Sequence, residues 1–500
     1  MEAFLSGFEA VLEPTNLLYC FIGVLIGMLV GILPGLGPTA TIAILLPITY
    51  GIEPVTAVIM LAGIYYGAQY GGTITSVLLR LPGEASTVVT VFDGFAMAKK
   101  GQAGTALGIA AIGSFIGGTV SIIGLSVLAP VIAGYAVRFG PPEYAVLTLI
   151  GIYLVSTVGS GDAFKSLASA GLGLLLATVG RDIFSGQTRF TFDSLALTDG
   201  LDFVVIAMGL FGVGEILYNL EDSGKPPRPP AVVSNVWPSR KDIRQSSGAI
   251  ARGSGLGFAL GVLPGGGATL SSLVAYAVEK RRAKDPTRFG RGAIEGVAGP
   301  ETANNAAATS SFIPLLTLGI PANATMALMF GALLIIGVTP GPRLVTEDPE
   351  LFWGVINSMY IGNIMLLIMS IPMVGIFVRI LRVKPAILAP ITVLVTLIGV
   401  YTVANSTMDV LLVIVFGLIG YLMKKFGFEP GPLVLAFVLG VIMETAVRQS
   451  MRIFGGDALG FVQRPISATL MGLLVLVIIA PIVTGFLKKK RDKRKADAHV

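Results

Sequence analysis

Gly31-Ile-Leu-Pro-Gly-Leu-Gly-Pro-Thr39 returns later in the chain as Gly261-Val-Leu-Pro-Gly-Gly-Gly-Ala-Thr269. Each copy interrupts an apolar segment with proline, which removes an amide donor, and with glycine, which permits left-handed backbone. A second pair follows, Val77-Leu-Leu-Arg-Leu-Pro-Gly-Glu-Ala-Ser86 and Pro314-Leu-Leu-Thr-Leu-Gly-Ile-Pro-Ala-Asn-Ala-Thr325. A single motif of this kind is an ordinary kink in a membrane helix, but two matched pairs favour a repeated fold built from broken helices.

The composition around these motifs is that of a membrane protein. Hydrophobic residues make up 54% of the 500 residues, charged residues make up 13%, and the mean hydropathy is +0.82. Apolar runs of roughly 20 residues recur, which is the length that a helix needs to cross the hydrocarbon layer. The backbone must pair internally in lipid, and the runs lack the alternation of β-barrel strands. The sequence therefore predicts an all-α polytopic membrane protein.

Rare residue types exclude several classes of function. The chain has one histidine, His499, and one cysteine, Cys20. A His/Cys metal site, a disulfide framework and Cys–His or Ser–His catalysis are therefore excluded. No G-x-x-x-x-G-K-S/T phosphate loop occurs, and the net charge of +6 comes with a basic tail typical of a cytoplasmic anchor. We expect no enzyme, no nucleic-acid partner and no cofactor, apart from Na⁺ or H⁺ as a coupling ion.

The positions of charged residues predict a topology. The N-terminal segment carries three glutamates and no basic residue before Arg80, whereas later loops and the tail are rich in lysine and arginine. The positive-inside rule therefore predicts an N-terminus that faces outward and a C-terminus in the cytoplasm. About eleven spanning helices fit this topology. They are expected near 54–70, 104–128, 143–159, 163–179, 200–219, 293–306, 352–379, 386–403, 408–424, 430–446 and 466–487.

The predicted topology gives the two copies opposite orientations, as in many secondary transporters. We expect the hairpin tips to form a mobile transport unit on a scaffold of the other helices, with a binding site at the membrane midplane. The expected units are a first inverted repeat 1–220 with re-entrant or broken hairpins 17–50 and 71–98, a cytoplasmic linker 221–246, a second inverted repeat 247–446 with hairpins 247–279 and 309–337, an extra C-terminal helix 447–487, and a basic cytoplasmic tail 488–500.

The helix breaks supply the candidate binding groups. A helix broken inside the membrane leaves carbonyls with partial negative charge at one end and amides with partial positive charge at the other. Carbonyls coordinate cations, whereas amides and hydroxyls bind anions. The candidate substrate-binding residues are Gly35, Gly37, Thr39, Gly265, Gly267, Thr269, Ser86, Asn304, Asn305, Asn323 and Thr325. The candidate ion-coupling residues are Pro34, Pro82, Gly83, Pro264, Thr309, Ser310 and Pro321.

Some of these polar groups also have a purely structural interpretation. Asn304 and Asn305 belong to the densest polar stretch at the expected membrane depth, where polar residues are costly unless they face a cavity or partners. Interhelical hydrogen bonding is the alternative to a binding site there. Two roles stay open for Glu301, a proton site and a structural acceptor. Glu84 and Arg80 flank a hairpin tip, where an ion pair without a transport role is equally consistent with the sequence.

The motifs carry a family resemblance. Together with the run 285–308 and its continuation Ile313-Pro-Leu-Leu-Thr-Leu-Gly-Ile-Pro321, they resemble the large membrane subunit of tripartite tricarboxylate transporters, the TctA family. The resemblance covers about residues 15–485. It implies a permease in the bacterial inner membrane that works with a small four-helix membrane subunit and a periplasmic solute-binding protein. Such a permease imports citrate-like tri- or dicarboxylates by symport with Na⁺ or protons. Ala322-Asn323 stand where the family pattern has Gly-Ser, which leaves the identity of the carboxylate open.

Two other classes of function stay open from the residues alone. A channel built from broken helices would conduct ions without a binding protein or a counter-gradient. A non-transporting scaffold for the small subunit would tolerate the loss of Asn304 and Asn305. An intramembrane enzyme is disfavoured because the sequence contains no visible nucleophile–base pair.

Overall fold

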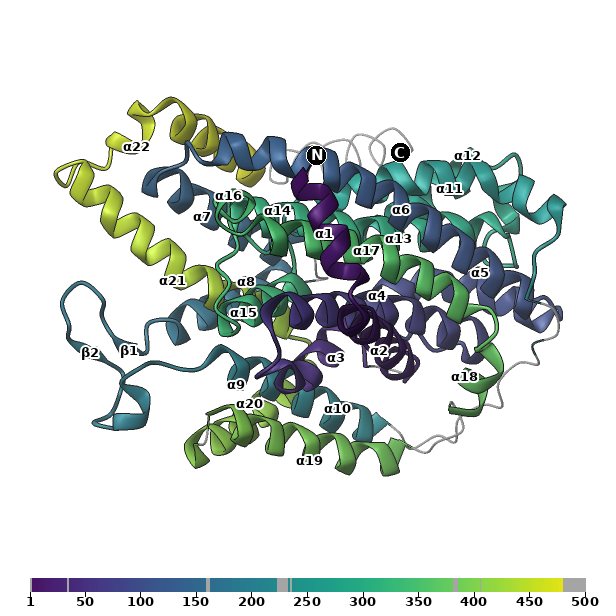
Figure 1. Ribbon diagram of the computed structural model, residues 1–500, viewed down its shortest axis with the longest axis horizontal. Coiled ribbons are helices and arrows are strands. Elements are labelled where there is room, and N and C mark those ends of the chain that lie inside the picture. Colours follow the sequence, from purple (N-terminus) through teal and green to yellow (C-terminus); the bar gives the residue numbers. More distant parts are fainter. Residues whose placement is uncertain are drawn as a thin grey trace, which may run out of the picture.

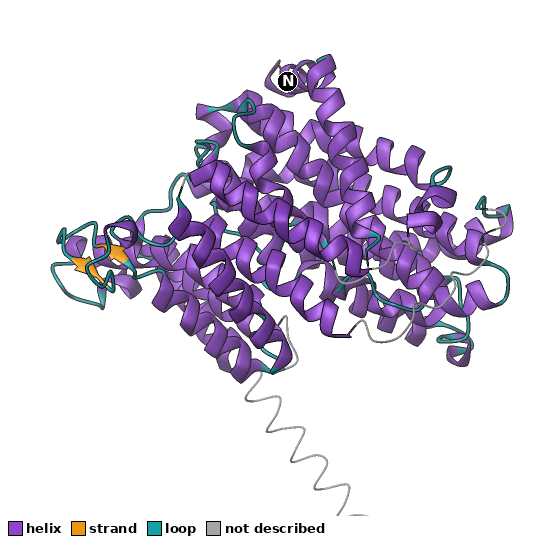
Figure 2. Cartoon of the chain, turned by 90° about the horizontal axis from the view of Figure 1, so that it is seen from below, coloured by secondary structure: helices purple, strands orange, loops and turns teal. Residues whose placement is uncertain are grey.

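The computed structural model describes residues 2–33, 36–158, 162–222, 233, 236–380, 385–404 and 406–479. These residues are almost entirely helical (Figure 1), and the short hairpin of β1 (Gly180–Arg181) and β2 (Thr188–Arg189) is the sheet found among them (Figure 2). The expected all-α polytopic class is confirmed. The described helices long and apolar enough to cross a membrane are Pro14–Gly31, Ala103–Ala136, Phe203–Glu221, Pro349–Ser370, Thr407–Lys425 and Pro430–Ile453.

The first half of the chain contains two helical hairpins followed by long helices. One hairpin joins α2 (Pro14–Gly31) to α3 (Pro38–Leu45), and the other joins α4 (Pro54–Leu79) to α5 (Val88–Lys99). Proline begins α2, α3 and α4, where its missing amide hydrogen costs no helical hydrogen bond. The other elements are α1 (Glu2–Leu12), η1 (Leu46–Thr49), η2 (Ala85–Thr87), α6 (Ala103–Ala136), α7 (Pro141–Val158), α8 (Ala163–Leu176), η3 (Leu195–Leu197), α9 (Phe203–Ala207), the π-helical η4 (Met208–Val213) and α10 (Gly214–Asp222).

The second half repeats this order of elements. One hairpin joins α11 (Arg240–Gly261) to α12 (Gly267–Arg282). In the other, α13 (Glu295–Ser310) continues into α14 (Phe312–Leu318), which turns into α15 (Ala324–Ile335). The remaining elements are η5 (Pro286–Arg288), α16 (Leu344–Glu347), α17 (Pro349–Ser370), α18 (Val374–Ile380), α19 (Pro385–Ala404), α20 (Thr407–Lys425), α21 (Pro430–Ile453), α22 (Gly460–Gln463) and an apolar helix Pro465–Ile479.

Two matching glycine stripes bring the long limbs of the hairpins together. The stripes are Gly23, Gly27 and Gly31 on α2, and Gly253, Gly257 and Gly261 on α11. A methyl group on Gly27 would overlap the carbonyl of Ile64 in α4, and one on Gly257 would overlap the carbonyl of Ala303 in α13. Such close backbone approach is typical of small-residue interfaces in membranes. The stripes therefore extend the likeness of the two halves beyond the proline–glycine motifs.

The helices form two groups (Figure 1): a hairpin group, which consists of the long hairpin limbs with α6 and α17, and the remaining helices, which pack around α20 and α21. The long hairpin limbs pack with α6 and α17, whereas α21 packs against α7 and α8, and α20 packs against η4, α10 and α19. The short limbs α3 and α15 contact each other, and they also contact η4 and α21 respectively. These two short limbs therefore lie between the hairpin group and the remaining helices.

Three expected boundaries need correction. The helix α4 runs unbroken from Pro54 to Leu79, so the span expected at 54–70 and the first limb of the hairpin 71–98 are one helix. The span expected at 352–379 is divided into α17 and α18, because Pro372 withdraws an amide from the helix. The linker expected to end at 246 ends earlier, because α11 begins at Arg240 with a reciprocal cap between Ser239 and Asp242.

Two elements were not expected from the sequence, namely α1 and the β1–β2 hairpin. The helix α1 packs on α17, where Gly7 lies against Trp353. Other expectations fall on residues that the structure does not describe: the part of the linker 221–246 at 223–232 and 234–235, the end of the helix expected at 466–487, and the tail 488–500. They stay predictions.

Candidate functional site

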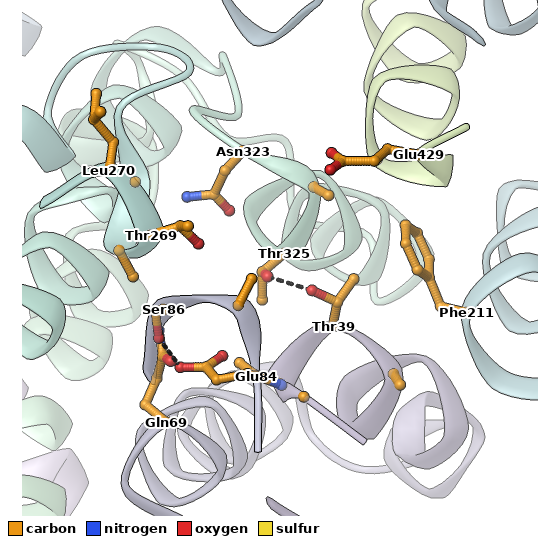
Figure 3. A pocket seen from close by; sticks show the side chains of 18 of the residues that line it. Thr39, Gln69, Glu84, Ser86, Phe211, Thr269, Leu270, Asn323, Thr325 and Glu429 are labelled. Carbon is orange, nitrogen blue, oxygen red and sulfur yellow. Dashed lines mark hydrogen bonds between the residues drawn. The ribbon is translucent and has the colours of Figure 1, made fainter. Parts of the chain in front are cut away.

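A cavity of about 530 Å³ lies among the breaks of all four hairpins (Figure 3). Helix N-termini carry partial positive charge and amides without helical partners. Among the described residues, five helix N-termini line the cavity, at 37–40 (α3), 82–86 (η2, continuing into α5), 265–270 (α12), 323–325 (α15) and 429–432 (α21). Their convergence suits an anion, and the volume is that of a small-molecule site.

Thr39 and Thr325 join the two halves of the chain at this cavity. Their hydroxyl oxygens lie 2.7 Å apart, so one hydroxyl donates to the other (Figure 3). Gly37, which caps α3 two residues before Thr39, has a φ of −70°, so its backbone does not require glycine. A methyl group there would lie 3.2 Å from the Cβ of Glu84. Space beside the neighbouring hairpin tip therefore favours glycine at this position.

Glu84 places a carboxylate at the tip between α4 and α5. Ser86 donates its hydroxyl to Oε1, and the donating amide nitrogen of Gln69 lies 2.9 Å from Oε2. The tip lies directly on α4, because a methyl group on Gly83 would overlap the Cα of Gly72. The donors that hold this carboxylate among the described residues are all neutral.

The ion pair considered from the sequence for this tip does not form. The guanidinium of Arg80 lies over the ring of Phe95, 5.9 Å from its centroid, and Arg80 lines a separate cavity that shares no lining residue with this one. Arg80 ends α4 in the left-handed conformation, which directs the chain away from the helix before it reaches Glu84. No basic side chain among the described residues pairs with Glu84.

Asn323 holds the position in the second half that Glu84 holds in the first. Its Oδ1 accepts a backbone amide of the first turn of α15 at 3.0 Å, and its Nδ2 donates to the hydroxyl of Ser311 at 3.3 Å. The amide of Gly265 donates to the carbonyl of Ala322 at 2.8 Å. Asn323, which departs from the family pattern, therefore caps α15. Its tip is hydrogen-bonded to the break between α11 and α12 through Ala322 and Gly265.

The remaining wall of the cavity comes from residues that sequence reasoning missed. Phe211 of η4, Glu215 of α10, Lys424 of α20 and Glu429 line this side. Lys424 donates to Glu215 and is the basic residue among the described lining residues. One signal could have found this wall: Glu429-Pro-Gly-Pro432 repeats the proline–glycine pattern of the tips.

The structure brings most of the predicted site residues together, but not all. Those that line the cavity are Gly37, Thr39, Pro82, Gly83, Ser86, Gly265, Gly267, Thr269, Asn323 and Thr325. Those that do not line it are Pro264, Asn304, Asn305, Thr309, Ser310 and Pro321. Pro34 and Gly35 lie outside the described residues. Of the lining glycines, Gly265 and Gly267 have φ values of +78° and +55°, which side chains disfavour.

A buried polar cluster lies on α13, apart from the cavity lining. Glu301 accepts hydrogen bonds from Thr73 at 2.6 Å and from Thr90. Asn305 donates to the hydroxyl of Ser114 at 2.7 Å and to the carbonyl of Glu301 at 3.2 Å. These contacts tie α13 to α4, α5 and α6. Glu301 is therefore a structural acceptor in this structure, and its role as a proton site stays a prediction.

Asn304 and Asn305 form a matched pair for mutagenesis. Asn305→Ala removes two buried hydrogen bonds and is expected to lower the free energy of unfolding by about 1 kcal/mol. Asn304→Ala should lower it less, because this buried amide makes no hydrogen bond of ordinary geometry with the described residues, although it lies close enough to the carboxylate of Glu84 to interact with it. Neither variant should change substrate affinity per folded molecule. Thermal unfolding and substrate binding, measured on the same samples, test this. A loss of affinity in Asn304→Ala would instead support the substrate contact expected from the sequence.

Comparison with known proteins identifies relatives along the whole chain. The sequence profile described as "Tripartite tricarboxylate transporter TctA family" matches residues 17–435. An "Uncharacterized 52.8 kDa protein in TAR-I ttuC' 3'region" of Agrobacterium vitis is 50% identical over 488 residues, 97% of each chain. An "Uncharacterized protein in TAR-II ttuC' 3'region" of the same organism is 51% identical over 238 residues, 47% of this chain and 98% of its own. No solved structure matches the chain.

Proposed function

The chain belongs to the tripartite tricarboxylate transporter TctA family, and from that premise we propose that it is the permease subunit that imports a di- or tricarboxylate through the cavity between the hairpin breaks. The family points to a transporter rather than an enzyme. The observation that carries the proposal is the convergence of five helix N-termini on one cavity. Broken helices place such N-termini at anionic substrate groups in secondary transporters.

The pairing of the N-termini favours a substrate with more than one carboxylate. Thr39 of α3 is hydrogen-bonded to Thr325 of α15. In the same way, Ser272 of α12 donates to the carbonyl of Ser86 in η2. Each contact joins a helix from the first half of the chain to a helix from the second, and the N-termini of these helices line the cavity in two pairs. The pairs offer two places for an anionic group. A di- or tricarboxylate occupies both places at once.

The carboxylate of Glu84 supports coupling to a cation. It lines the same cavity as the N-termini and has only neutral donors as partners among the described residues. An anionic substrate is repelled by this carboxylate unless a proton or Na⁺ neutralises it. Cation and substrate then favour each other's binding, which is the thermodynamic condition for symport. We propose this coupling for the chain, with either Na⁺ or H⁺ as the ion.

The family supports association with other components of a tripartite transporter. We propose a small four-helix membrane subunit and a periplasmic solute-binding protein as these partners. The proposed location is the bacterial inner membrane, with the N-terminus in the periplasm and the C-terminus in the cytoplasm.

The matching hairpins and glycine stripes of the two halves support inverted repeats. The separate packing of the hairpin group supports a transport unit that moves against a scaffold.

Uptake in proteoliposomes tests the function. The chain is reconstituted with its small subunit, the solute-binding protein is loaded with labelled di- or tricarboxylate, and Na⁺ or pH gradients are imposed. We expect accumulation with one of these gradients and none with ATP alone, because the sequence contains no nucleotide-binding loop. Flux that needs neither a gradient nor the binding protein would identify a channel. ATP-driven uptake without a gradient would also contradict the proposal.

Cysteine labelling tests the topology. Glu9→Cys and Glu347→Cys should react with an impermeant maleimide from the periplasm, whereas Lys284→Cys should react only after permeabilisation. The native Cys20 is buried, so the wild-type chain provides a low background. Labelling of Glu9→Cys only from the cytoplasm would remove the argument for opposite orientations, since both halves would then begin on the same side.

A further inference from the structure

A second cavity, of about 500 Å³, lies between α5, α12 and the loop that follows α12. It shares no lining residue with the substrate cavity, and no acidic residue lines it within the described part of the chain. Its lining is basic and aromatic. The basic residues are Arg80, Lys99 and Lys280, and the aromatic residues are Phe92, Phe95, Tyr276 and Phe289.

Within the described part of the chain, no carboxylate pairs with any of the three cations of this cavity. The Arg80 guanidinium lies 5.9 Å and the Lys99 ammonium 5.1 Å from the centroid of one ring, that of Phe95. The ion pairs found among the described residues near this cavity involve other side chains. Like charges gathered at one ring repel each other, and a cation–π contact offsets only a small part of that repulsion. An anion in the cavity would offset the rest.

The carboxylates near this cavity already have other hydrogen-bond or ion-pair partners. Oδ1 of Asp93 accepts three backbone amides of the loop 290–293, at 2.7, 2.8 and 2.9 Å. Oδ2 of Asp93 accepts the hydroxyl of Tyr276 at 2.9 Å, which holds that ring in the cavity wall. Glu279 pairs with Arg252 at 2.6 Å. The anion that the cavity suits therefore comes from outside this chain.

The backbone conformation of Arg80 also supports a role for this cavity in binding an anion. Arg80 has a φ of +62° at the C-terminal end of α4, a conformation that is unfavourable for a residue with a Cβ atom. Such strain persists where the surrounding structure or a function maintains it. Here it places the guanidinium at the cavity, beside Phe95.

Exposed apolar side chains lie next to the basic groups. Phe92 lines the cavity and is 50% exposed, and Val88, one helical turn earlier on α5, is 37% exposed. Leu81, directly after Arg80, is 45% exposed. Since residues four apart share a helix face, Val88 and Phe92 form an apolar strip that leads away from the cations. This combination fits an amphiphile with an anionic head.

We propose that this cavity binds the phosphate headgroup of an anionic phospholipid through Arg80, Lys99 and Lys280, with an acyl chain along Val88 and Phe92. Basic pockets between membrane helices on the cytoplasmic side are places where anionic headgroups bind. The topology predicted from the sequence puts Lys99 and Lys280 on that side. The headgroup cavity shares no lining residue with the substrate cavity, whereas Val88, at the far end of the apolar strip, also lines the substrate cavity. The proposal does not rest on the transport function.

The test uses the purified full-length chain in detergent, with native mass spectrometry and thermal unfolding as readouts. Dioleoylphosphatidylglycerol is compared with dioleoylphosphatidylcholine and with glycerol 3-phosphate. The test variant is R80Q/K99Q/K280Q, and the matched control is R281Q/R282Q/K284Q, which removes as many charges from the same end of α12 without touching the cavity. Each cavity cation should contribute roughly fivefold to affinity, so the triple variant should bind phosphatidylglycerol about 100-fold more weakly.

We expect wild type and the control to retain and be stabilised by phosphatidylglycerol in preference to phosphatidylcholine, and the test variant to lose this preference. Equal retention of phosphatidylglycerol by the test variant and by the control would contradict binding at this cavity. Stabilisation by glycerol 3-phosphate as large as that by the lipid would overturn the acyl-chain contact and leave a free phosphate ester as the ligand. If the triple variant does not fold, K99Q and K280Q, each changed alone at an exposed position, should each weaken lipid binding about fivefold. Unchanged binding in both would contradict the proposal.

Discussion

Glu84→Gln should abolish the dependence of substrate affinity on the coupling cation. The amide keeps the size of the carboxylate but carries no charge to repel an anionic substrate. Charges about 6 Å apart interact by about 3 kcal/mol at an effective dielectric constant of 20, which is roughly 100-fold in affinity. Wild-type protein should therefore bind substrate about 100-fold more tightly when the coupling cation saturates its site, and the variant should bind with one affinity throughout.

Substrate binding to the purified protein, measured across Na⁺ concentration and across pH, tests this expectation. If the substrate affinity of the wild type depends on Na⁺ concentration, the coupling ion is Na⁺; if it depends on pH, the coupling ion is the proton. For a proton, wild type should bind more tightly as the pH falls, and Glu84→Gln should stay tight at high pH. Glu301→Gln is the comparison, because Glu301 is buried but does not line the cavity. Wild-type cation dependence in Glu84→Gln, together with its loss in Glu301→Gln, would move the coupling site to Glu301.

Gly257→Val should prevent stable folding, whereas Gly255→Val should be tolerated. A Cβ atom on Gly257 would overlap the backbone of Ala303 in α13, and backbone atoms cannot turn aside as a side chain does. The helices would have to separate, so the cost should exceed the roughly 1–3 kcal/mol typical of overpacking. Gly255 lies on the same helix with no atom within 4 Å of an added Cβ. Both substitutions change helix propensity alike, so their difference isolates the contact.

The measurements are the yield of monodisperse protein after size-exclusion chromatography and the temperature of unfolding. Gly27→Val in the first half should behave like Gly257→Val, since Gly27 meets the backbone of Ile64 in the same manner. Comparable yields of Gly257→Val and Gly255→Val would show that α11 and α13 do not require this close approach.

The sequence by itself determined the membrane class and the positions of the four breaks. Both depend on local chemistry. Long apolar runs must form helices in lipid, and proline and glycine end or distort a helix wherever they occur. The small and hydroxyl residues beside the breaks, such as Thr39 and Thr325, could be identified as candidates for the same reason. The glycine stripes were also readable from their spacing of four residues, although sequence reasoning did not use them.

Only the tertiary structure decided which polar groups meet. Asn305 lies in the richest polar stretch, yet its amide bonds Ser114 of α6 and does not line the cavity. Lys424 and Glu429, which sequence reasoning did not select, line the cavity instead. The face that a helix turns to a cavity is set by its close contacts with neighbouring helices, and those contacts join residues far apart in the sequence, such as Gly257 with Ala303 and Asn305 with Ser114. The residues next to each other in the sequence do not determine these long-range contacts. The hairpin tips could therefore be predicted from the sequence, but the residues that contact them could not.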